Sequence, residues 1–519
     1  MLAEPRTLID ELLAEQGALS AVERFSRLHD QGLAEGSRYA RLLPQSRPGQ
    51  GQQYSFEVDL DQCSGCKACV TACHSMNGLL PNEAWRDVGQ LVSRSANPPR
   101  LQTVTTACHH CLDPGCLNGC PVLAYEKDPE TGIVHHLDDQ CMGCQYCVLK
   151  CPYDVPKYSG QLGIVRKCDM CSQRLENGEA PACVQACPNE AIRIRLVDVA
   201  EIAQSLRERP EGFLPDAPDG RITLPTTRFV RRQEFAVDTA AVNADEPRLQ
   251  PPHWPLVWML VLTQMGIGTW WAALAERGAV RNAAFLLSLA LTAAGVIASV
   301  FHLGQPLKAW RAFLGFRKSW MSREILAFSL FLPAGLSVLL LNSFGRADHS
   351  SADWLPGAVA ALGGLAVLCS GMIYHDTQRP TWRGGRSLGR FLLTSALLGS
   401  LVISVVAAAQ EVSAAAWPWI IAGLALIKVG LEYRWLRVSA SSVSTPLHQS
   451  ARLQWRELPR LTWARLAALL VGGLMFPVLI ASQPPVHIAA ASLALCWFAE
   501  TTERYVFFRT MVSARMPGV

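Results

Sequence analysis

The sequence predicts a protein in two parts, a small α+β domain built on cysteine-rich loops and an all-α membrane domain of eight helices. Sixteen of the eighteen cysteines lie in four runs between Cys63 and Cys187. Apolar stretches of membrane-spanning length follow Trp254, and none precedes it. We therefore expect four regions: an N-terminal helical extension (1–53), the cysteine domain (54–200), a linker (201–253) and the membrane domain (254–519).

The cysteine runs read CSGCKACVTAC, CHHCLDPGCLNGCP, CMGCQYCVLKCP and CDMC with CVQACP. A C-x2-C-x2-C loop supplies three thiolates to one iron-sulfur cubane, and a fourth cysteine three residues on ligates the other cluster of a pair. Each run therefore serves two clusters. If the first run pairs with the fourth and the second with the third, the four ligand sets are Cys63, Cys66, Cys69 and Cys187; Cys168, Cys171, Cys183 and Cys73; Cys108, Cys111, Cys116 and Cys151; and Cys141, Cys144, Cys147 and Cys120. The triplets follow from the motif, whereas the pairing of the runs is a separate assumption.

Two other uses of cysteine compete with this prediction. Disulfides would suit a secreted protein, yet the first residues, MLAEPRTLIDELL, do not read as a signal peptide. Structural zinc uses C-x2-C pairs separated by a longer loop. A third cysteine two residues on, and a fourth after three more, favours iron-sulfur clusters over both.

The remaining soluble segments carry weaker signals. LIDELLAEQ and ALSAVERFSRL predict one or two short amphipathic helices, which either pack on the protein or dock to a partner. YSFEVDL, GIVHHL and IRIRLV predict short strands beside the cysteine loops, as in two packed ferredoxin-like units. The linker is rich in Pro, Asp and Arg. A formal net charge of +4 favours no nucleic-acid partner.

The membrane domain divides into eight predicted spans of near-bilayer length. They run from Trp254 to Ala275, Asn282 to Leu303, Glu324 to Phe344, Trp354 to His375, Leu388 to Ala409, Ala415 to Trp435, Leu461 to Ser482 and Val486 to Phe508. An even number of spans returns the C-terminus to the side of the cysteine domain.

The distribution of Lys and Arg predicts which side that is. Seventeen of these residues fall in the loops and tail on the cysteine-domain side, with Arg504 counted in the tail, and three fall on the opposite side. We therefore expect the cysteine domain to face the cytoplasm from the inner membrane. A partner subunit with an export signal would reverse this orientation.

The two halves resemble different subunits of one protein family. The four runs and GIVRKCDMC are similar to the four-cluster electron-transfer subunits of molybdopterin oxidoreductases. HLGQPLKAWRAFLGFRKSWMSREI, from His302 to Ile325, resembles the membrane anchor of dimethyl sulfoxide reductase. Some relatives replace one cysteine of the third run by tryptophan and hold a 3Fe-4S cluster, whereas Cys144 is present here. The resemblance implies four 4Fe-4S clusters, a separate molybdopterin (bis-guanine-dinucleotide) catalytic subunit, and quinone or menaquinone as the mobile substrate.

Polar residues beside the predicted spans are candidates for the quinone site. His302 ends the second span, and Arg323 and Glu324 begin the third on the same side. The resemblance associates the histidine of the HLG-x-P motif with quinol, and His302 or Glu324 could accept a proton. The alternative is that these residues anchor the membrane interface and cap helices. Tyr374, His375 and Asp376 form a weaker set.

For three further sets of residues, an ordinary structural role is the simpler interpretation. His302 and His375 could ligate a b-type haem, although the resemblance implies none. Lys428 and Arg465 are expected near the interface, with side chains that extend to water. Cys369 and Cys496 are expected to act as small apolar residues.

The function predicted from these observations is an electron-transfer and membrane-anchor subunit, not catalytic for the complex's substrate on its own. One alternative is a cytoplasm-facing complex of the sulfite dehydrogenase type, which donates electrons to quinone. A second is an ion-translocating redox module, which would need acids or lysines buried near mid-span. The charges in the sequence are expected to gather toward one interface instead.

Overall fold

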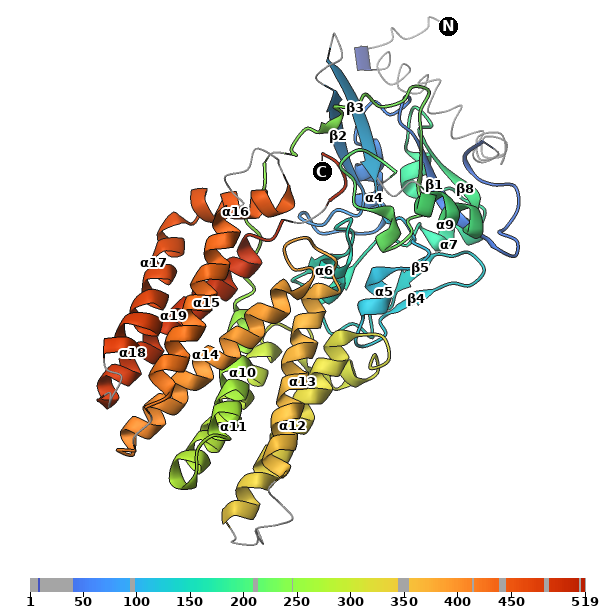
Figure 1. The fold of residues 1–519 in the computed structure, drawn as a ribbon. Coiled ribbons are helices and arrows are strands. Elements are labelled where there is room, and N and C mark those ends of the chain that lie inside the picture. The colour runs from blue at the N-terminus through green and yellow to red at the C-terminus, as the bar shows by residue number, and fades with distance from the viewer. Residues whose placement is uncertain are drawn as a thin grey trace, which may run out of the picture.

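The computed structural model describes most of the protein. The described residues are 8–9, 41–93, 99–208, 213–244, 246–343, 354–412, 415–437, 445–479, 485–512 and 515–518. The amphipathic helices predicted within residues 1–53 lie almost wholly outside them. Figure 1 shows the cysteine-rich half at one end and a bundle of long helices at the other.

The cysteine-rich half is built on two small sheets. In the first, β1 (Gln52–Asp59) pairs antiparallel with β8 (Ile192–Asp198), which joins the beginning of this half to its end. In the second, β2 (Asp87–Ser93) pairs antiparallel with β3 (Arg100–Thr106). Two hairpins complete the strands: β4 (Tyr125–Lys127) with β5 (Val134–His136), and β6 (Lys157–Ser159) with β7 (Ile164–Arg166). The strands predicted at YSFEVDL, GIVHHL and IRIRLV are present.

Short helices continue the cysteine loops. They are α4 (Ala68–Met76), α5 (Gly115–Gly119), α6 (Tyr146–Lys150), α7 (Ser172–Glu176) and α8 (Ala182–Gln185). The residues before α4 and α6 adopt the left-handed conformation, with φ of 60° at Lys67 and 58° at Gln145. The first and third runs therefore fold in the same way, as expected for an internal repeat.

The segment predicted as a linker takes part in both sheets. It contains α9 (Val199–Glu208), which begins just before residue 201, and a 3-10 turn at Gly220–Ile222. Strand β9 (Arg228–Val230) then lies parallel to β1, and β10 (Ala240–Ala241) pairs with β2. The segment is therefore built into the cysteine-rich half before the polypeptide reaches the first long helix.

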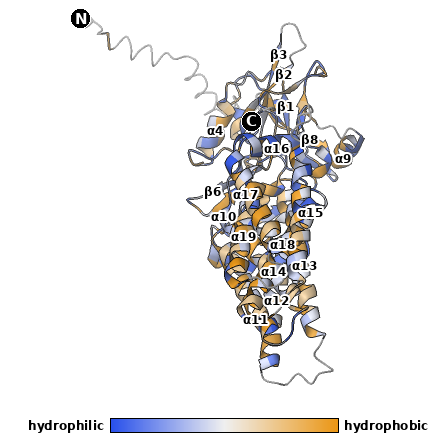
Figure 2. Cartoon of the chain, turned by 60° about the vertical axis from the view of Figure 1, so that its left-hand side comes forward, coloured by the Kyte–Doolittle hydropathy of each residue, from blue (hydrophilic) through white to orange (hydrophobic). Residues whose placement is uncertain are grey.

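The second half is a helical bundle. Six of its helices are long and apolar enough to cross a membrane: α10 (Trp254–Ala273), α11 (Gly278–Val300), α12 (Trp320–Ser343), α13 (Leu355–His375), α14 (Gly385–Ala409) and the helical segment Pro459–Val478. That last segment joins α17 (Pro459–Leu470), a π-helical turn (Val471–Met475) and α18 (Phe476–Leu479). Apolar residues dominate this half in Figure 2.

Two further long helices belong to the same bundle. They are α15 (Trp417–Arg437) and α19 (Val486–Arg509), and both carry several charged residues. They coincide with the sixth and eighth predicted spans. Helix α16 (Pro446–Arg456) is short and lies at the end of the bundle nearest the cysteine-rich half (Figure 1).

The C-terminal residues pack on the cysteine-rich half. Met516 is 2 % exposed and belongs to the apolar core that also contains Phe56 and Leu91. The backbone of Pro517 and Gly518 passes so close to Gly89 that an added Cβ there would lie 2.2 Å from the Pro517 carbonyl oxygen. The tail thus joins the last long helix to the sheet containing β2, on the side predicted for the C-terminus.

Candidate metal centres and their contact with the membrane helices

The structure brings cysteines of different runs together around two cavities. One cavity is lined by Cys108, Cys111, Cys116 and Cys151, and the other by Cys120, Cys141, Cys144 and Cys147. These are the sets that follow from pairing the second run with the third.

The remaining eight run cysteines are also close to one another, as electrostatic interactions between their sulfurs indicate. Cys63 interacts with Cys66, Cys69 and Cys187. In the next group, Cys73 interacts with Cys171 and Cys183, and Cys168 interacts with Cys73 and Cys171. The first run is therefore close to the fourth.

Neighbouring groups are also close to one another. Cys183 interacts electrostatically with Cys69, which links the first group to the group of Cys168. Cys168 in turn interacts with Cys108 of the third group. Lys167 is 4 % exposed and lies among Cys108, Cys116 and Cys168. Burial acts to lower the pKa of Lys167, but these sulfurs raise it above its ordinary value, so a cation lies between two groups of thiolates.

The surroundings of the sulfurs suit thiolate ligands. Backbone N–H groups of Ala124, Gly143, Met170 and Ala191 donate to the sulfurs of Cys120, Cys141, Cys168 and Cys187 at 3.2–3.4 Å. Hydrogen bonds to sulfur are one means by which a protein sets the potential of an iron-sulfur cluster. All sixteen run cysteines are free of disulfide bonds in the structure. Among the described residues, no three His, Cys, Asp or Glu side chains are placed to share one metal ion.

The loop of the third cysteine run touches the HLGQP segment between α11 and α12. Gln305 donates its backbone N–H to the Met142 carbonyl at 3.0 Å and its side-chain amide to the Leu162 carbonyl at 2.8 Å. Gly304 packs directly on Gly163, because an added Cβ at Gly304 would lie 2.1 Å from the Gly163 carbonyl oxygen. The close approach of the HLGQP segment to the turn between β6 and β7 therefore depends on glycine.

Helix α6, which continues the same run, docks on the end of α13. The Tyr146 hydroxyl donates to the Ile373 carbonyl at 3.0 Å, and Lys150 pairs with Asp376 at 2.7 Å. Arg379 donates to the Leu149 carbonyl at 2.9 Å. The cysteine group of Cys120, Cys141, Cys144 and Cys147 is therefore held against the ends of the long helices.

The three residues predicted for a quinone site have different surroundings. His302 lies just beyond the end of α11, with its ring 5.3 Å from that of His253 in an edge-to-face arrangement. Glu324 is 5 % exposed on α12 and accepts a hydrogen bond from Ser370 on α13. Arg323 donates instead to the carbonyls of Phe316 and Arg317, at 3.1 and 2.8 Å. The side chains of Arg323 and Glu324 thus contact different parts of the bundle.

Other polar residues near the helix ends also have identified partners. The His375 ring accepts from the Gly384 backbone N–H at 3.0 Å, which closes the turn between α13 and α14. His302 contacts His253 rather than His375. The sequence prediction missed His253, although it stands directly before the first apolar stretch.

The prediction that Lys428 and Arg465 extend to water is wrong. Lys428 is 6 % exposed and pairs with Glu500 at 2.6 Å, and Arg465 is 4 % exposed and pairs with Glu432 at 2.7 Å. Both partners lie on other helices of the bundle. Arg504, counted among the residues of the tail, is fully buried within α19.

Both halves of the protein match known protein families. The family model described as "4Fe-4S dicluster domain" matches residues 100–196, and that described as "DMSO reductase anchor subunit (DmsC)" matches residues 250–509. Fold and cysteine groups thus define an iron-sulfur electron-transfer protein fused to a membrane anchor. The protein belongs to the DMSO reductase anchor subunit family and is a multi-pass membrane protein.

The cysteine-rich half is similar to several electron-transfer proteins. It is 36 % identical over 187 residues to the B subunit of the anaerobic dimethyl sulfoxide reductase of Escherichia coli K12, covering 34 % of this protein and 85 % of the relative. It is 32 % identical over 184 residues to the thiosulfate reductase electron transfer subunit PhsB of Salmonella typhi, covering 35 % and 95 %. It is 36 % identical over 174 residues to the hydrogenase-2 operon protein HybA of Escherichia coli O157:H7, covering 28 % of this protein. The match spans about half (53 %) of the length of HybA.

Proposed function

We propose that this protein carries electrons between membrane quinone and a separate molybdopterin catalytic subunit through four 4Fe-4S clusters. The observation that supports this most directly is the contact between the third cysteine run and the HLGQP segment, through Gly304 and Gln305. It holds one end of the series of cysteine groups against the ends of the membrane helices. When bound, a 4Fe-4S cluster takes up and releases an electron.

The order of the cysteine groups supports a linear path. The group of Cys141 lies at the membrane helices, and Tyr125 interacts both with its Cys147 and with Cys116 of the group of Cys108. The groups of Cys168 and Cys63 follow in that order. Cys66 of that last group is exposed, whereas most of the run cysteines are buried. We propose that the catalytic subunit binds at the end of the series near Cys66, because electron transfer between subunits requires a cluster near the protein surface.

His302 and Glu324 are the residues that we assign to quinol. Both residues lie at the ends of helices next to the loop of the third run. Glu324 is buried there, and its carboxylate can accept a proton released on quinol oxidation. Arg323 stabilises the loop that leads into α12 and so supports the position of Glu324. This assignment places no haem in the site.

We further propose eight membrane spans, with the cysteine-rich half in the cytoplasm. Helices α15 and α19 have spanning length, and their charged residues face other helices. The excess of Lys and Arg on the cysteine-rich side supports the cytoplasmic orientation. A reporter fused to the C-terminus should be active in the cytoplasm, and periplasmic activity would contradict the orientation.

Iron analysis and rapid mixing test the electron path. Four cubanes require about sixteen iron atoms per polypeptide, so a value near eight would contradict the four-cluster assignment. Mixing the purified protein with a short-chain quinol should bleach the iron-sulfur absorbance, or quinone should reoxidise the dithionite-reduced protein. If neither reaction occurs while dithionite still reduces the clusters, the protein does not react with quinone.

A further inference from the structure

Arg86 is a buried arginine in the cysteine-rich half. It stands directly before β2 and is 1 % exposed. Its Nη1 atom donates to the Thr105 hydroxyl at 3.2 Å, whereas Nε and Nη2 have no hydrogen-bond partner among the described residues. The next residue, Asp87, interacts more strongly with Lys157 than with Arg86. Within the part of the chain that the structure describes, the guanidinium thus has no hydrogen bond to a carboxylate.

The negative charge around Arg86 comes from cysteine sulfurs of two neighbouring groups. The guanidinium interacts electrostatically with four of them: Cys69 of the first group, and Cys73, Cys168 and Cys183 of the next. Burial acts to lower the pKa of Arg86, but these sulfurs raise it above its ordinary value. Arg86 is therefore a cation between two groups of predicted cluster ligands.

Residues of β1 and β3 hold the guanidinium in this position. The Phe56 ring of β1 lies against it, with the guanidinium carbon 4.7 Å from the ring centroid. Thr105 of β3 accepts from Nη1, and its hydroxyl oxygen lies 3.5 Å from the Cys69 sulfur. A hydroxyl that accepts from arginine still has its own proton to donate, and a thiolate accepts. Thr105 therefore links the guanidinium to Cys69.

The buried charge of Arg86 needs a counter-charge. An uncompensated charge inside a protein is strongly destabilising. Four thiolates give a 4Fe-4S cluster an overall negative charge, and reduction adds one further negative charge. The sulfurs around Arg86 therefore supply its counter-charge when they bind iron.

A fixed cation beside a cluster favours the reduced form. Its attraction is greater for the form with more negative charge, and burial keeps water and salt from screening it. Arginine does not lose its proton in proteins, so the cation is permanent. A hydrogen bond from Thr105 to the Cys69 sulfur also stabilises negative charge there. The guanidinium and the hydroxyl thus act in the same direction.

We propose that Arg86 raises the reduction potentials of the clusters held by the groups of Cys63 and Cys168, and that Thr105 positions it. The proposal rests on the four clusters proposed above. These two clusters form the end of the series near Cys66, where we place the catalytic subunit. A cation between them also reduces the repulsion between their negative charges. Arg86 thus sets the potential at which electrons pass between this end and the partner.

Redox titration of the purified full-length protein, followed by electron paramagnetic resonance, tests this proposal. Chemical mediators set the potential, so the measurement needs neither quinone nor the catalytic subunit. Cys66→Ser and Cys171→Ser assign the signals, because each should alter the signal of one of the two clusters. Iron analysis of every variant shows whether its clusters are retained.

Arg86→Gln removes the charge and keeps a polar side chain. We expect the equilibrium constant for reduction of both clusters to fall about tenfold or more, which is about 60 mV for a one-electron couple. Arg86→Lys keeps the charge and should keep both potentials close to those of the native protein. Unchanged potentials in Arg86→Gln at native iron content would overturn the proposal. An equal fall in Arg86→Lys would also overturn it, because charge would not be the cause.

Arg100→Gln is the matched control for the change of charge. Arg100 begins β3, the strand that carries Thr105, but it is exposed. Water and salt screen its charge, so this variant should have native potentials. A fall equal to that of Arg86→Gln would show that net charge, rather than the buried guanidinium, sets the potentials, and would overturn the proposal.

Thr105→Val decides the question if Arg86→Gln does not retain its iron. Valine has nearly the shape of threonine and leaves Arg86 in place, but it removes the hydrogen bonds to the guanidinium and to Cys69. The potential of the Cys63 cluster should then fall, and an unchanged potential would overturn the proposal.

Failure of the proposed electron path is recognised separately. If quinol does not reduce the protein but Arg86→Gln lowers the potentials, the quinone assignment fails and the role of Arg86 remains. If quinol reduces the protein and Arg86→Gln has native potentials, the reverse holds.

Discussion

Replacing Gly304 by alanine should push the HLGQP segment away from the turn between β6 and β7 and so weaken the contact of Gln305 with the third cysteine run. The added Cβ would lie 2.1 Å from the Gly163 carbonyl oxygen and 2.5 Å from its carbonyl carbon. Both are backbone atoms and cannot rotate away. Ordinary contact begins near 3.4 Å, so the two loops must move apart by roughly 1 Å.

The cost of this separation can be estimated from the contacts that it disturbs. Gln305 makes two hydrogen bonds across the junction, at 3.0 and 2.8 Å. Losing both costs about 1–3 kcal/mol, and overpacking adds about 1–3 kcal/mol. We therefore expect a lower melting temperature and slower reduction of the clusters by quinol, with reduction by dithionite unchanged.

Gly160→Ala is the matched control for this substitution. Gly160 lies in the turn between β6 and β7, three residues before Gly163, and an added Cβ there meets nothing within 4 Å. Stopped-flow absorbance and thermal melting should distinguish the two variants. If Gly304→Ala matches Gly160→Ala in both measurements, the junction at Gly304 does not hold the path together.

Three further substitutions test other parts of the protein. Cys144→Ser should lower the iron content by about one to four atoms and abolish quinol-linked reduction. Cys369→Ser, on α13 outside the runs, should change neither. Equal iron content in both variants would argue against Cys144 as a ligand. Glu324→Gln should slow quinol-linked reduction by about 100-fold by removing a proton acceptor, and a rate within twofold of the native protein would exclude that role. Met516→Asp should destabilise the iron-sulfur half by about 2–5 kcal/mol, measured by denaturant titration of cluster absorbance, and an unchanged midpoint would show that the tail does not contribute to stability.

Local patterns in the sequence predict much of this architecture. Hydropathy places the first long helix at Trp254 to Ala275, and α10 runs from Trp254 to Ala273. The strand predicted at YSFEVDL is β1. Both signals depend on residues near in sequence, because side-chain periodicity is a local property of a helix or strand.

Contacts between distant segments cannot be predicted in the same way. The sequence around Arg228–Val230 reads as a charged linker, yet it forms β9 beside β1. The HLG-x-P motif identifies His302, but its neighbour His253 is 49 residues earlier in the sequence. Pairings of this kind are determined by packing, which hydropathy does not record.

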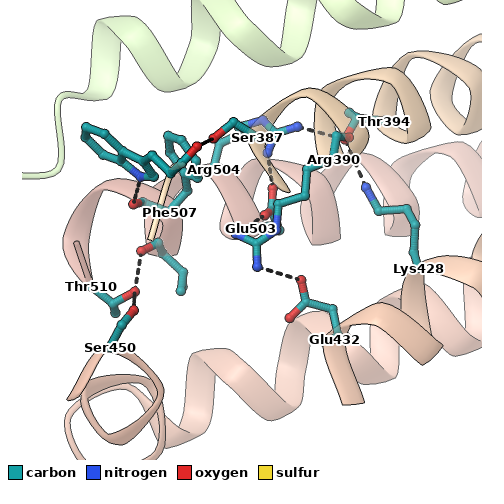
Figure 3. Close-up of polar contacts among 12 residues, drawn as sticks. Ser387, Arg390, Thr394, Lys428, Glu432, Ser450, Glu503, Arg504, Phe507 and Thr510 are labelled. Carbon is teal, nitrogen blue, oxygen red and sulfur yellow. Dashed lines mark hydrogen bonds and ion pairs between the residues drawn. The ribbon is translucent and has the colours of Figure 1, made fainter. Parts of the chain in front are cut away.

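The partners of the charged residues in the long helices likewise cannot be predicted from the sequence. A lone lysine in an apolar stretch is expected to extend to the membrane surface, and Lys428 matches that description in the sequence. Glu500, its partner, lies on α19, a different helix of the bundle. The pair forms only when both helices are in place, because each charge stabilises the other inside the bundle. The charged residues of α15 and α19 are therefore explained by their partners on neighbouring helices (Figure 3), which the hydropathy of a single helix does not record.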